Sequence, residues 1–242
     1  MSAEQSPLTA RAWPLRHAVA FVVGVAGLTL VASRVLRAMP GARLGATTTS
    51  LVILTTFTLV YAIELGIVWL VVRRAGVAFG ESVGLRAVPG MGMWLAAAVA
   101  TSFGLRFVAA GYAAFMAQMH WLLPGWDANP AKYFPRGPLG SAVLIFIIVL
   151  AAPLVEEVIF RGILLPSLAS RFGERWGVAV TVVVFAAMHL NPFSFAPILL
   201  VGFALAMLFL RSRSLWVSVV CHSAFNGIGI LTLLVLRGNG VV

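Results

Sequence analysis

Long apolar runs alternate with short polar connections along most of this chain of 242 residues. Most runs reach the roughly 20 residues that an α-helix needs to cross the hydrocarbon of a bilayer. The runs cover residues 13–37, 50–72, 91–121, 141–166, 176–190, 195–210 and 215–236. The pattern predicts an all-α polytopic membrane protein, a bundle of about seven transmembrane helices that forms a single membrane domain over residues 1–242.

Composition supports this fold class. Hydrophobic residues make up 61% of the chain and charged residues 10%, and the mean hydropathy is +1.03. These values lie far outside the range of a soluble globular domain. We therefore expect a multi-pass protein of the cell membrane, in a bacterial plasma membrane.

The formal net charge of +10 comes from 17 lysines and arginines against 7 acidic residues. Most of the basic residues lie in connections between apolar runs, which is typical of membrane orientation and headgroup contact. Their modest excess on the side of the N-terminus predicts a cytoplasmic N-terminus. Nucleic-acid binding would require basic clusters interleaved with aromatics on a soluble face, and the sequence has none. We therefore expect the protein to contact the lipid bilayer and not to bind nucleic acid.

The stretch Ser141–Pro166 carries charge where an apolar helix does not need it. Fourteen residues without charge, 142–155, precede Glu156, Glu157 and Arg161 in the same helical run. Each such charge near the middle of a spanning helix costs about 3 kcal/mol. Three of them within six residues predict an intramembrane polar site.

Helical spacing separates the two glutamates. Glu157 and Arg161 are four residues apart with the acid first, which favours an ion pair on one helix face. Glu156 is rotated by about 100° from Glu157 and has no partner on its own helix. A lone carboxyl in a buried setting suits proton transfer near neutral pH. We expect its partners to come from other helices.

Two downstream runs supply candidate partners. Phe185 with His189, and His222 with Asn226, are four residues apart, so each pair shares a helix face. By helix rise, Glu156, His189 and His222 lie about 18, 20 and 11 Å from the same membrane face. Singly, such residues are also interpreted as contacts between helices, and Phe185 as packing. Together they predict one shared site.

Two other features are interpreted more simply. Glu64 and Arg106 lie inside the second and third runs, and we expect a structural ion pair between them, with substrate or carboxylate recognition as the alternative. The connection 122–138 holds four prolines and three aromatics. We interpret it as a loop anchored at the headgroups, with a lip over the site as the alternative.

The three motifs resemble those of the CPBP family, also called the abortive infection family. This family comprises CAAX prenyl endopeptidases and bacteriocin-processing or self-immunity membrane proteins. The motifs are EExxxR (Glu156, Glu157, Arg161), FxxxH (Phe185, His189) and HxxxN (His222, Asn226). The resemblance covers about residues 140–230 and indicates a motif-bearing catalytic core at about 138–236. The first three runs carry no motif of the family.

The resemblance implies an intramembrane endopeptidase that cuts a peptide bond of a membrane-associated protein or peptide. It implies that Glu156 and His189 activate the attacking water, and that His222 and Asn226 stabilise the oxyanion. Glu157 and Arg161 would hold their helix in register, with Phe185 as a further supporting residue. A base that deprotonates water and neutral donors placed at the developing charge fit this reaction.

Alternatives for the chemistry stay open at this stage. Glu156, His189 and His222 could bind a divalent metal such as zinc with an open fourth position, although a compact HExxH helix is lacking. The metal-free glutamate mechanism is preferred, so no cofactor is predicted. Ser218 and His222 have the spacing of a serine nucleophile and its base, but this pair explains neither glutamate.

A different class of function uses the same polar residues. A non-hydrolytic membrane transporter, or a bacteriocin immunity scaffold, could employ the Glu/His cluster as a relay or binding site. Such a relay would need a polar path across the membrane, and the first, second and sixth runs supply little lining besides Glu64. The peptidase is therefore the preferred hypothesis, without a prediction that its substrate is prenylated.

Overall fold

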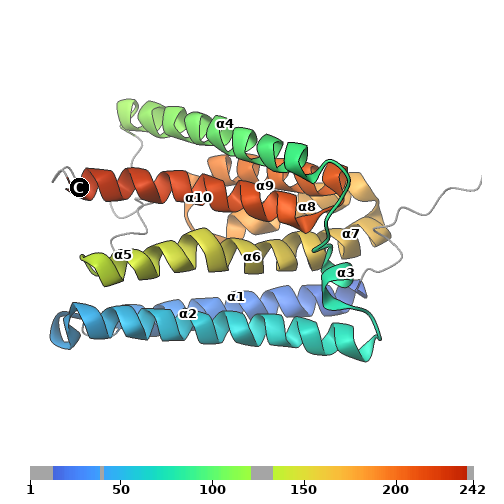
Figure 1. The fold of residues 1–242 in the computed structure, drawn as a ribbon, viewed down its shortest axis with the longest axis horizontal. Coiled ribbons are helices and arrows are strands. Elements are labelled where there is room, and N and C mark those ends of the chain that lie inside the picture. The colour runs from blue at the N-terminus through green and yellow to red at the C-terminus, as the bar shows by residue number, and fades with distance from the viewer. Residues whose placement is uncertain (1–12, 39–40, 121–132, 239–242) are drawn as a thin grey trace, which may run out of the picture.

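The structure is a computed structural model that describes residues 13–38, 41–120 and 133–238, and all regular elements in these ranges are helices. Most of the long helices run side by side (Figure 1). They are α1 (Leu15–Ala38), α2 (Gly41–Arg74), α3 (Phe79–Val83), α4 (Met91–Gln118), α5 (Pro138–Ile145), η2 (Phe146–Ala151), α6 (Ala152–Glu157), η3 (Val158–Leu164), α7 (Leu165–Phe172), α8 (Glu174–Met188), α9 (Pro192–Ser212) and α10 (Leu215–Gly238). The segments η2 and η3 are π-helical.

The predicted fold class, an all-α multi-pass membrane protein, is confirmed. In the described part of the chain, six helices are long and apolar enough to cross a membrane by length and composition. The run predicted at 176–190 forms α8, whose 15 residues span only about 22 Å. This helix ends early because Asn191 and Pro192 begin α9, where the Asn191 side chain accepts a hydrogen bond from the Ser194 amide.

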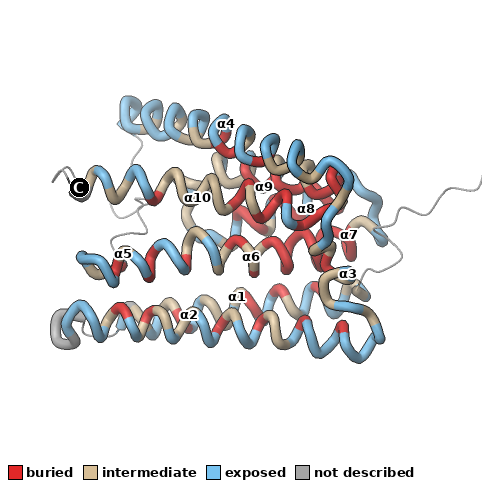
Figure 2. Tube along the Cα trace, viewed as in Figure 1, coloured by how far each residue is buried: buried red, intermediate tan, exposed pale blue. Residues whose placement is uncertain are grey.

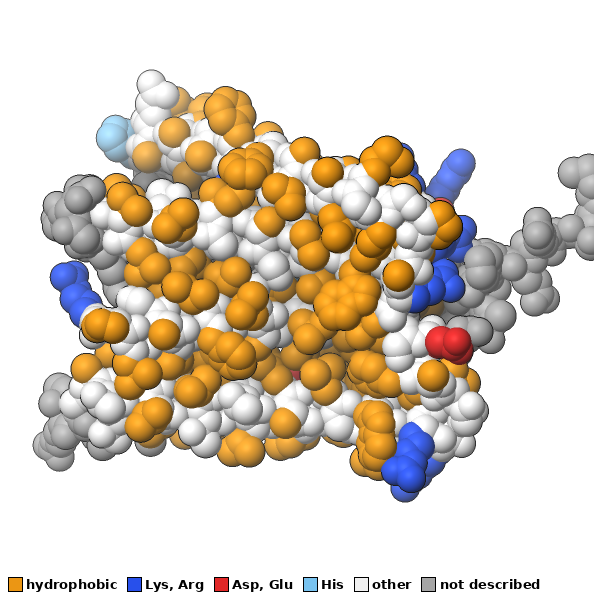
Figure 3. Space-filling model, in the orientation of Figure 1, with side chains coloured by type: hydrophobic (Ala, Val, Ile, Leu, Met, Phe, Trp, Pro, Cys, Tyr) orange, Lys and Arg blue, Asp and Glu red, His pale blue; other side chains and the backbone are white. Residues whose placement is uncertain are grey.

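The outer surface of the bundle is apolar along its length. Figure 3 shows hydrophobic side chains over most of the visible face, with arginines gathered mainly at the right-hand end. Large apolar side chains on α4 are among the most exposed, with Phe107 82% exposed and Met93 73% exposed. An apolar exterior of this kind matches contact with lipid.

One long helix forms the centre of the structure. The segments from α5 to α7 follow without interruption and make the span Pro138–Phe172. Of the residues in its most apolar 18-residue stretch, 56% are buried, whereas the corresponding stretches of the other five candidate spans are 17–33% buried. Figure 2 shows buried residues concentrated on α6, α7 and their neighbours α8 and α9. This central span packs against α1 and α2 on one side and α10 on the other.

Two prolines explain the π-helical segments of the central span. Pro153 and Pro166 lie within the first two residues of α6 and α7, directly after η2 and η3. Because proline lacks an N–H and its ring clashes with the carbonyl four residues earlier, the turn before each proline cannot be regular α-helix. The short segment α6, which carries Glu156 and Glu157, lies between the two widened turns.

The connection between α2 and α4 crosses one end of the bundle and holds the turn before α10. The Leu215 amide donates to the carbonyl of Gly84 at 2.7 Å, and Arg86 Nε donates to the carbonyl of Arg213 at 2.8 Å. Arg213 ends α9 in the left-handed conformation, with φ 60°. These bonds fix where α10 starts and therefore the position of His222 along it.

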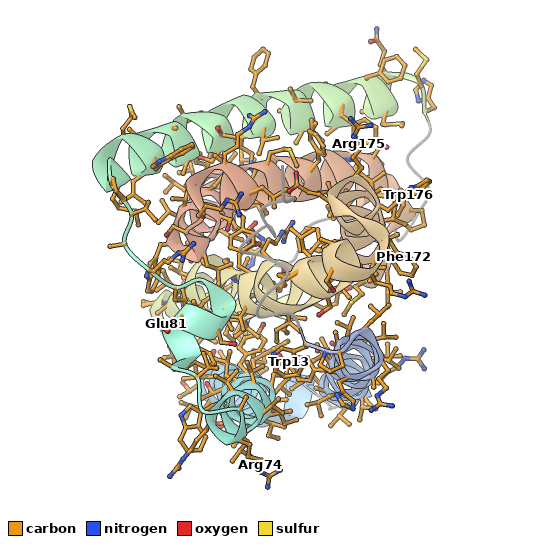
Figure 4. All side chains as sticks on the ribbon, turned by 90° about the vertical axis from the view of Figure 1, so that its right-hand side faces the viewer. Trp13, Arg74, Glu81, Phe172, Arg175 and Trp176 are labelled. Carbon is orange, nitrogen blue, oxygen red and sulfur yellow. The ribbon has the colours of Figure 1, made fainter. Side chains whose placement is uncertain are left out.

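The same end of the molecule collects several helix termini, and Figure 4 looks onto it. Trp13 before α1, Arg74 at the end of α2 and Phe172 at the end of α7 are labelled there. This arrangement agrees with antiparallel spans joined by short turns. The side of the membrane that this end faces stays a prediction.

The predicted ion pair between Glu64 and Arg106 is wrong. Glu64 accepts a hydrogen bond from the Thr29 hydroxyl on α1 at 3.4 Å, whereas Arg106 donates to the carbonyl of Phe225 on α10. The reason is the position of their helices, because α2 and α4 lie on opposite sides of the central span (Figures 1 and 4).

Residues 122–132 of the predicted connection 122–138 lie outside the described residues, so its two interpretations stay untested. Phe134, near its end, is buried among Ile53 and Val143.

The turn from α7 into α8 depends on two glycines. Gly173 has φ 84°, a conformation that side chains with a Cβ rarely adopt, and it lets the chain reverse. At Gly177 a Cβ would lie 2.8–3.0 Å from the backbone and Cβ of Ala169. The absence of a side chain therefore allows α8 to approach α7 closely, and this places Phe185 and His189.

We expect Gly177→Ala to lower the free energy of unfolding by about 1–3 kcal/mol, because Ala169 backbone atoms cannot move aside easily. The matched control is Gly104→Ala on α4, where a Cβ would meet nothing within 4 Å. That control should gain up to about 1 kcal/mol of helix stability. Unfolding in detergent micelles would measure both, and equal stability of the two variants would contradict the close packing of α7 on α8.

Candidate active site

A buried ion pair forms the centre of the candidate site. Arg161 Nη1 donates to Glu157 Oε1 at 2.8 Å, and both side chains are fully buried. The predicted pairing of these two residues is confirmed. Arg161 Nη2 also donates to the carbonyl of Gly202 on α9 at 2.9 Å, and its guanidinium lies 4.5 Å from the ring centroid of Phe185. The pair thus links the central span to α8 and α9.

Gly202 is a site residue that the sequence analysis missed. A Cβ at this position would lie 3.1 Å from the Phe185 ring and 3.6 Å from Arg161 Nη2. Glycine therefore lets the α9 backbone approach closely enough for its carbonyl to meet the guanidinium. The only sequence signal is a small residue in an apolar span, which commonly indicates close helix packing.

His222 on α10 is the second partner of Glu157. Its Nδ1 lies 3.0 Å from Glu157 Oε1, and the residue is 4% exposed. Because Glu157 Oε1 already accepts a hydrogen bond from Arg161, we assign the proton of this second contact to His222 Nδ1. This bond orients the imidazole, and Nε2 is the ring nitrogen directed toward Glu156.

Glu156 differs from Glu157 in its partners. Its side chain is 31% exposed, yet the atom Oε2 is buried and has no hydrogen-bond partner among the described residues. His222 Nε2 lies 3.9 Å from Oε2, which is too long for a direct hydrogen bond. The two atoms are therefore neighbours without a direct hydrogen bond between them.

His189 joins the cluster through Phe185. The residue caps the C-terminal end of α8, is exposed, and its Nδ1 donates to the carbonyl of Phe185 at 2.8 Å. Its ring lies 5.0 Å from the Phe185 ring, which in turn lies 5.9 Å from the ring of His222. In the described chain no hydrogen bond or ion pair connects His189 directly to Glu156 or His222. Phe185 is therefore the common neighbour of both imidazoles.

Asn226 lies one turn after His222 and binds the central span. Its Nδ2 donates to the carbonyl of Ile148 in η2 at 2.9 Å. At the end of η2 the Ala152 amide donates to the carbonyl of Ile147, five residues earlier. By the same spacing, the amide of residue 153 would donate to the carbonyl of Ile148. Proline has no N–H, and the Asn226 amide occupies the acceptor that this leaves.

The metal and serine alternatives have less support from the geometry. Among the described residues no three His, Cys, Asp or Glu side chains are grouped so that they could hold a metal ion. The set of Glu156, His189 and His222 therefore does not converge as a ligand shell would. Ser218 is buried and donates to the carbonyl of Leu215 at 3.1 Å, not to His222.

We expect Arg161→Met to cost about 3–5 kcal/mol of unfolding free energy, because it leaves the Glu157 carboxylate buried without its cation. Adding Glu157→Gln removes that charge, so the double variant should be more stable than Arg161→Met alone. Unfolding in mixed micelles gives both values, with Arg211→Met on the exposed side of α9 as control. Additive effects of the two substitutions would show that the pair is not coupled.

The chain was compared with known proteins in three ways. Residues 138–228 match the family model described as Rce1-like, type II CAAX prenyl endopeptidase Rce1-like. The comparisons with curated proteins and with solved structures found no match. The matched segment runs from the start of α5 into α10 and contains all three motifs and the Glu157–His222 contact. The chain therefore contains a domain of the Rce1-like type II CAAX prenyl endopeptidase (CPBP) family, a family of intramembrane endopeptidases.

Proposed function

We propose that the chain is an intramembrane endopeptidase that hydrolyses a peptide bond of a membrane-associated protein or peptide. The observation that carries the proposal is the pairing of Glu156 Oε2 with His222 Nε2 across 3.9 Å, over the fully buried Glu157–Arg161 pair. A water that enters beside Glu156 with the substrate would meet a carboxylate able to take its proton. We also propose a single membrane domain with its catalytic core at about 138–236.

In the proposed reaction Glu156 takes a proton from water, with His189 assisting, while the water oxygen attacks the carbonyl carbon of the scissile bond. The carbonyl oxygen becomes an oxyanion, for which His222 and Asn226 are the proposed donors. The proton held by Glu156 then passes to the nitrogen as the C–N bond breaks. The products are a new carboxylate and a new amine.

The supporting residues act through the catalytic ones. Glu157 holds His222 by its Nδ1 proton and so directs Nε2 toward the reacting groups. Donation from Nε2 to the oxyanion requires the imidazolium form of His222, because a neutral imidazole has only one N–H. Arg161 holds the Glu157 carboxylate in place. Phe185 contacts both imidazoles and the Arg161 guanidinium, and it fixes their relative positions.

We expect Glu156→Gln to reduce cleavage of a membrane-tethered reporter peptide by about 10²- to 10⁴-fold in proteoliposomes, because glutamine cannot take the proton from water. Its unfolding should match the wild type, since the replaced carboxylate is not part of the buried ion pair. The control is Glu174→Gln at the exposed start of α8, which should cleave at the wild-type rate.

Cleavage by Glu156→Gln at the wild-type rate would overturn the role of this residue. Transport of a solute across the same proteoliposomes, without peptide cleavage by the wild type, would favour the transporter hypothesis. If the wild type neither transports a solute nor cleaves a peptide, the immunity scaffold becomes the better interpretation.

A further inference from the structure

A groove of about 620 Å³ runs between α1 and α2, which lie side by side (Figure 1). On the side of α1 its lining residues recur every three or four positions from His17 to Leu28, which is about 16 Å along one helix face. On the side of α2 it is lined by Glu64, Ile67 and Val71, which have the same spacing. The groove therefore follows the direction of the spans over about three turns of helix.

Two small residues open the groove toward the lipid. Ala20 and Gly24 lie four residues apart on α1, both are exposed, and both line the groove. A Cβ added to Gly24 would meet nothing within 4 Å. Small residues at this spacing let the backbones of two membrane helices approach closely, and they are typical of helix contacts in bilayers. The shape of the groove therefore suits a further transmembrane helix.

Glu64 adds a carboxyl group to the lining of the groove. The residue is 2% exposed, and the Thr29 hydroxyl donates a long hydrogen bond of 3.4 Å to it. No basic side chain pairs with Glu64 in the described part of the chain. A carboxyl group inside a membrane span is costly, and ionisable groups there commonly pair with one another. Glu64 therefore lacks the cation that would compensate its charge.

The depth of Glu64 indicates what kind of cation can reach it. Glu64 lies ten residues before Arg74, the last residue of α2, which is about 15 Å along the helix axis. The hydrocarbon of a bilayer is about 30 Å thick, so this carboxyl group lies near the midplane. Lipid headgroups carry their charges at the membrane surface and not at this depth. A lysine or arginine in the middle of a membrane helix does lie there.

We propose that the groove between α1 and α2 binds a transmembrane helix of a partner protein, and that this helix carries a lysine or arginine near its midpoint that pairs with Glu64. Ala20 and Gly24 admit the backbone of the partner helix. Ile67 and Val71, which are 42% and 41% exposed, contact its apolar side chains. The inference concerns assembly within the membrane, and it does not depend on the proposed hydrolysis.

The test uses two transmembrane peptides that differ in one group. Each has an apolar core of about 21 leucines and alanines, long enough to cross the bilayer. The central core residue is lysine in one peptide and norleucine, which lacks only the ammonium group, in the other. The full-length protein carries a fluorescent donor, the peptides carry an acceptor, and energy transfer in phosphatidylcholine liposomes gives the association constants.

The readout is the lysine/norleucine ratio of the two association constants. Polar contacts between membrane helices predict a wild-type ratio on the order of 5- to 30-fold. Glu64→Gln should bring the ratio close to one, because glutamine keeps the shape of the side chain and loses its charge. The control Glu174→Gln, at the exposed start of α8, should keep the wild-type ratio. Each ratio compares two peptides on one preparation, so it does not depend on the amount of folded protein.

A second pair of variants tests the groove itself. Gly24→Leu should abolish the association of both peptides, because the leucine side chain fills the space that the partner helix needs. The matched control is Gly111→Leu on the exposed side of α4, where a Cβ would also meet nothing within 4 Å. This control should bind both peptides as the wild type does.

Several results would overturn the inference, whether or not the wild type cleaves any peptide. These are no association of the lysine peptide with the wild type, a wild-type ratio close to one, and a ratio that Glu64→Gln leaves unchanged. Association that survives in Gly24→Leu would overturn it as well. If octadecylamine binds to the wild type but not to Glu64→Gln, and the lysine peptide does not associate, the groove binds a cationic amphiphile and not a helix.

Discussion

The bond between Glu157 and Arg161 is the interaction on which the arrangement of the site depends. Oε1 of this one carboxylate accepts from Arg161 and from His222, and the same guanidinium donates to the carbonyl of Gly202. These contacts join the central span, α9 and α10 at a point where both charged side chains are fully buried. In such surroundings an unpaired charge costs several kcal/mol, so the three helices have little freedom to shift relative to one another.

The two neighbouring glutamates have different surroundings because successive residues of a helix are rotated by about 100° from one another. Glu157 is fully buried and its Oε1 contacts both Arg161 and His222, while Glu156 is 31% exposed and has no ion pair with an arginine in the described chain. The Oε2 atoms of both glutamates are buried without a hydrogen-bond partner among the described residues. Because the side chain of Glu157 is fully buried, a water or substrate has no access to its carboxylate. The partly exposed glutamate is the one available for proton transfer.

Much of this arrangement follows from local rules that a sequence displays. Apolar runs predict the spans, and the four-residue spacing predicts the pair of Glu157 with Arg161. The contacts of Arg106 and Gly202 were not predictable, because their partners are a backbone carbonyl and a guanidinium on other helices. Every residue has a carbonyl, so nothing in the sequence singles out the one at Phe225. Helix crossing decides such contacts, and it also separates Glu64 from Arg106.

The position of Asn226 shows how a proline on one helix can place a polar side chain on another. Pro153 removes the N–H that the π-helical pattern of η2 would direct to Ile148, and the Asn226 amide donates to that carbonyl instead. One of its two amide protons is then fixed, so the direction of the second is fixed as well. A donor oriented before the substrate arrives needs no rearrangement when charge develops, which is the property that makes oxyanion stabilisation effective. The anchoring of Asn226 to the central span therefore supports its proposed catalytic role rather than competing with it.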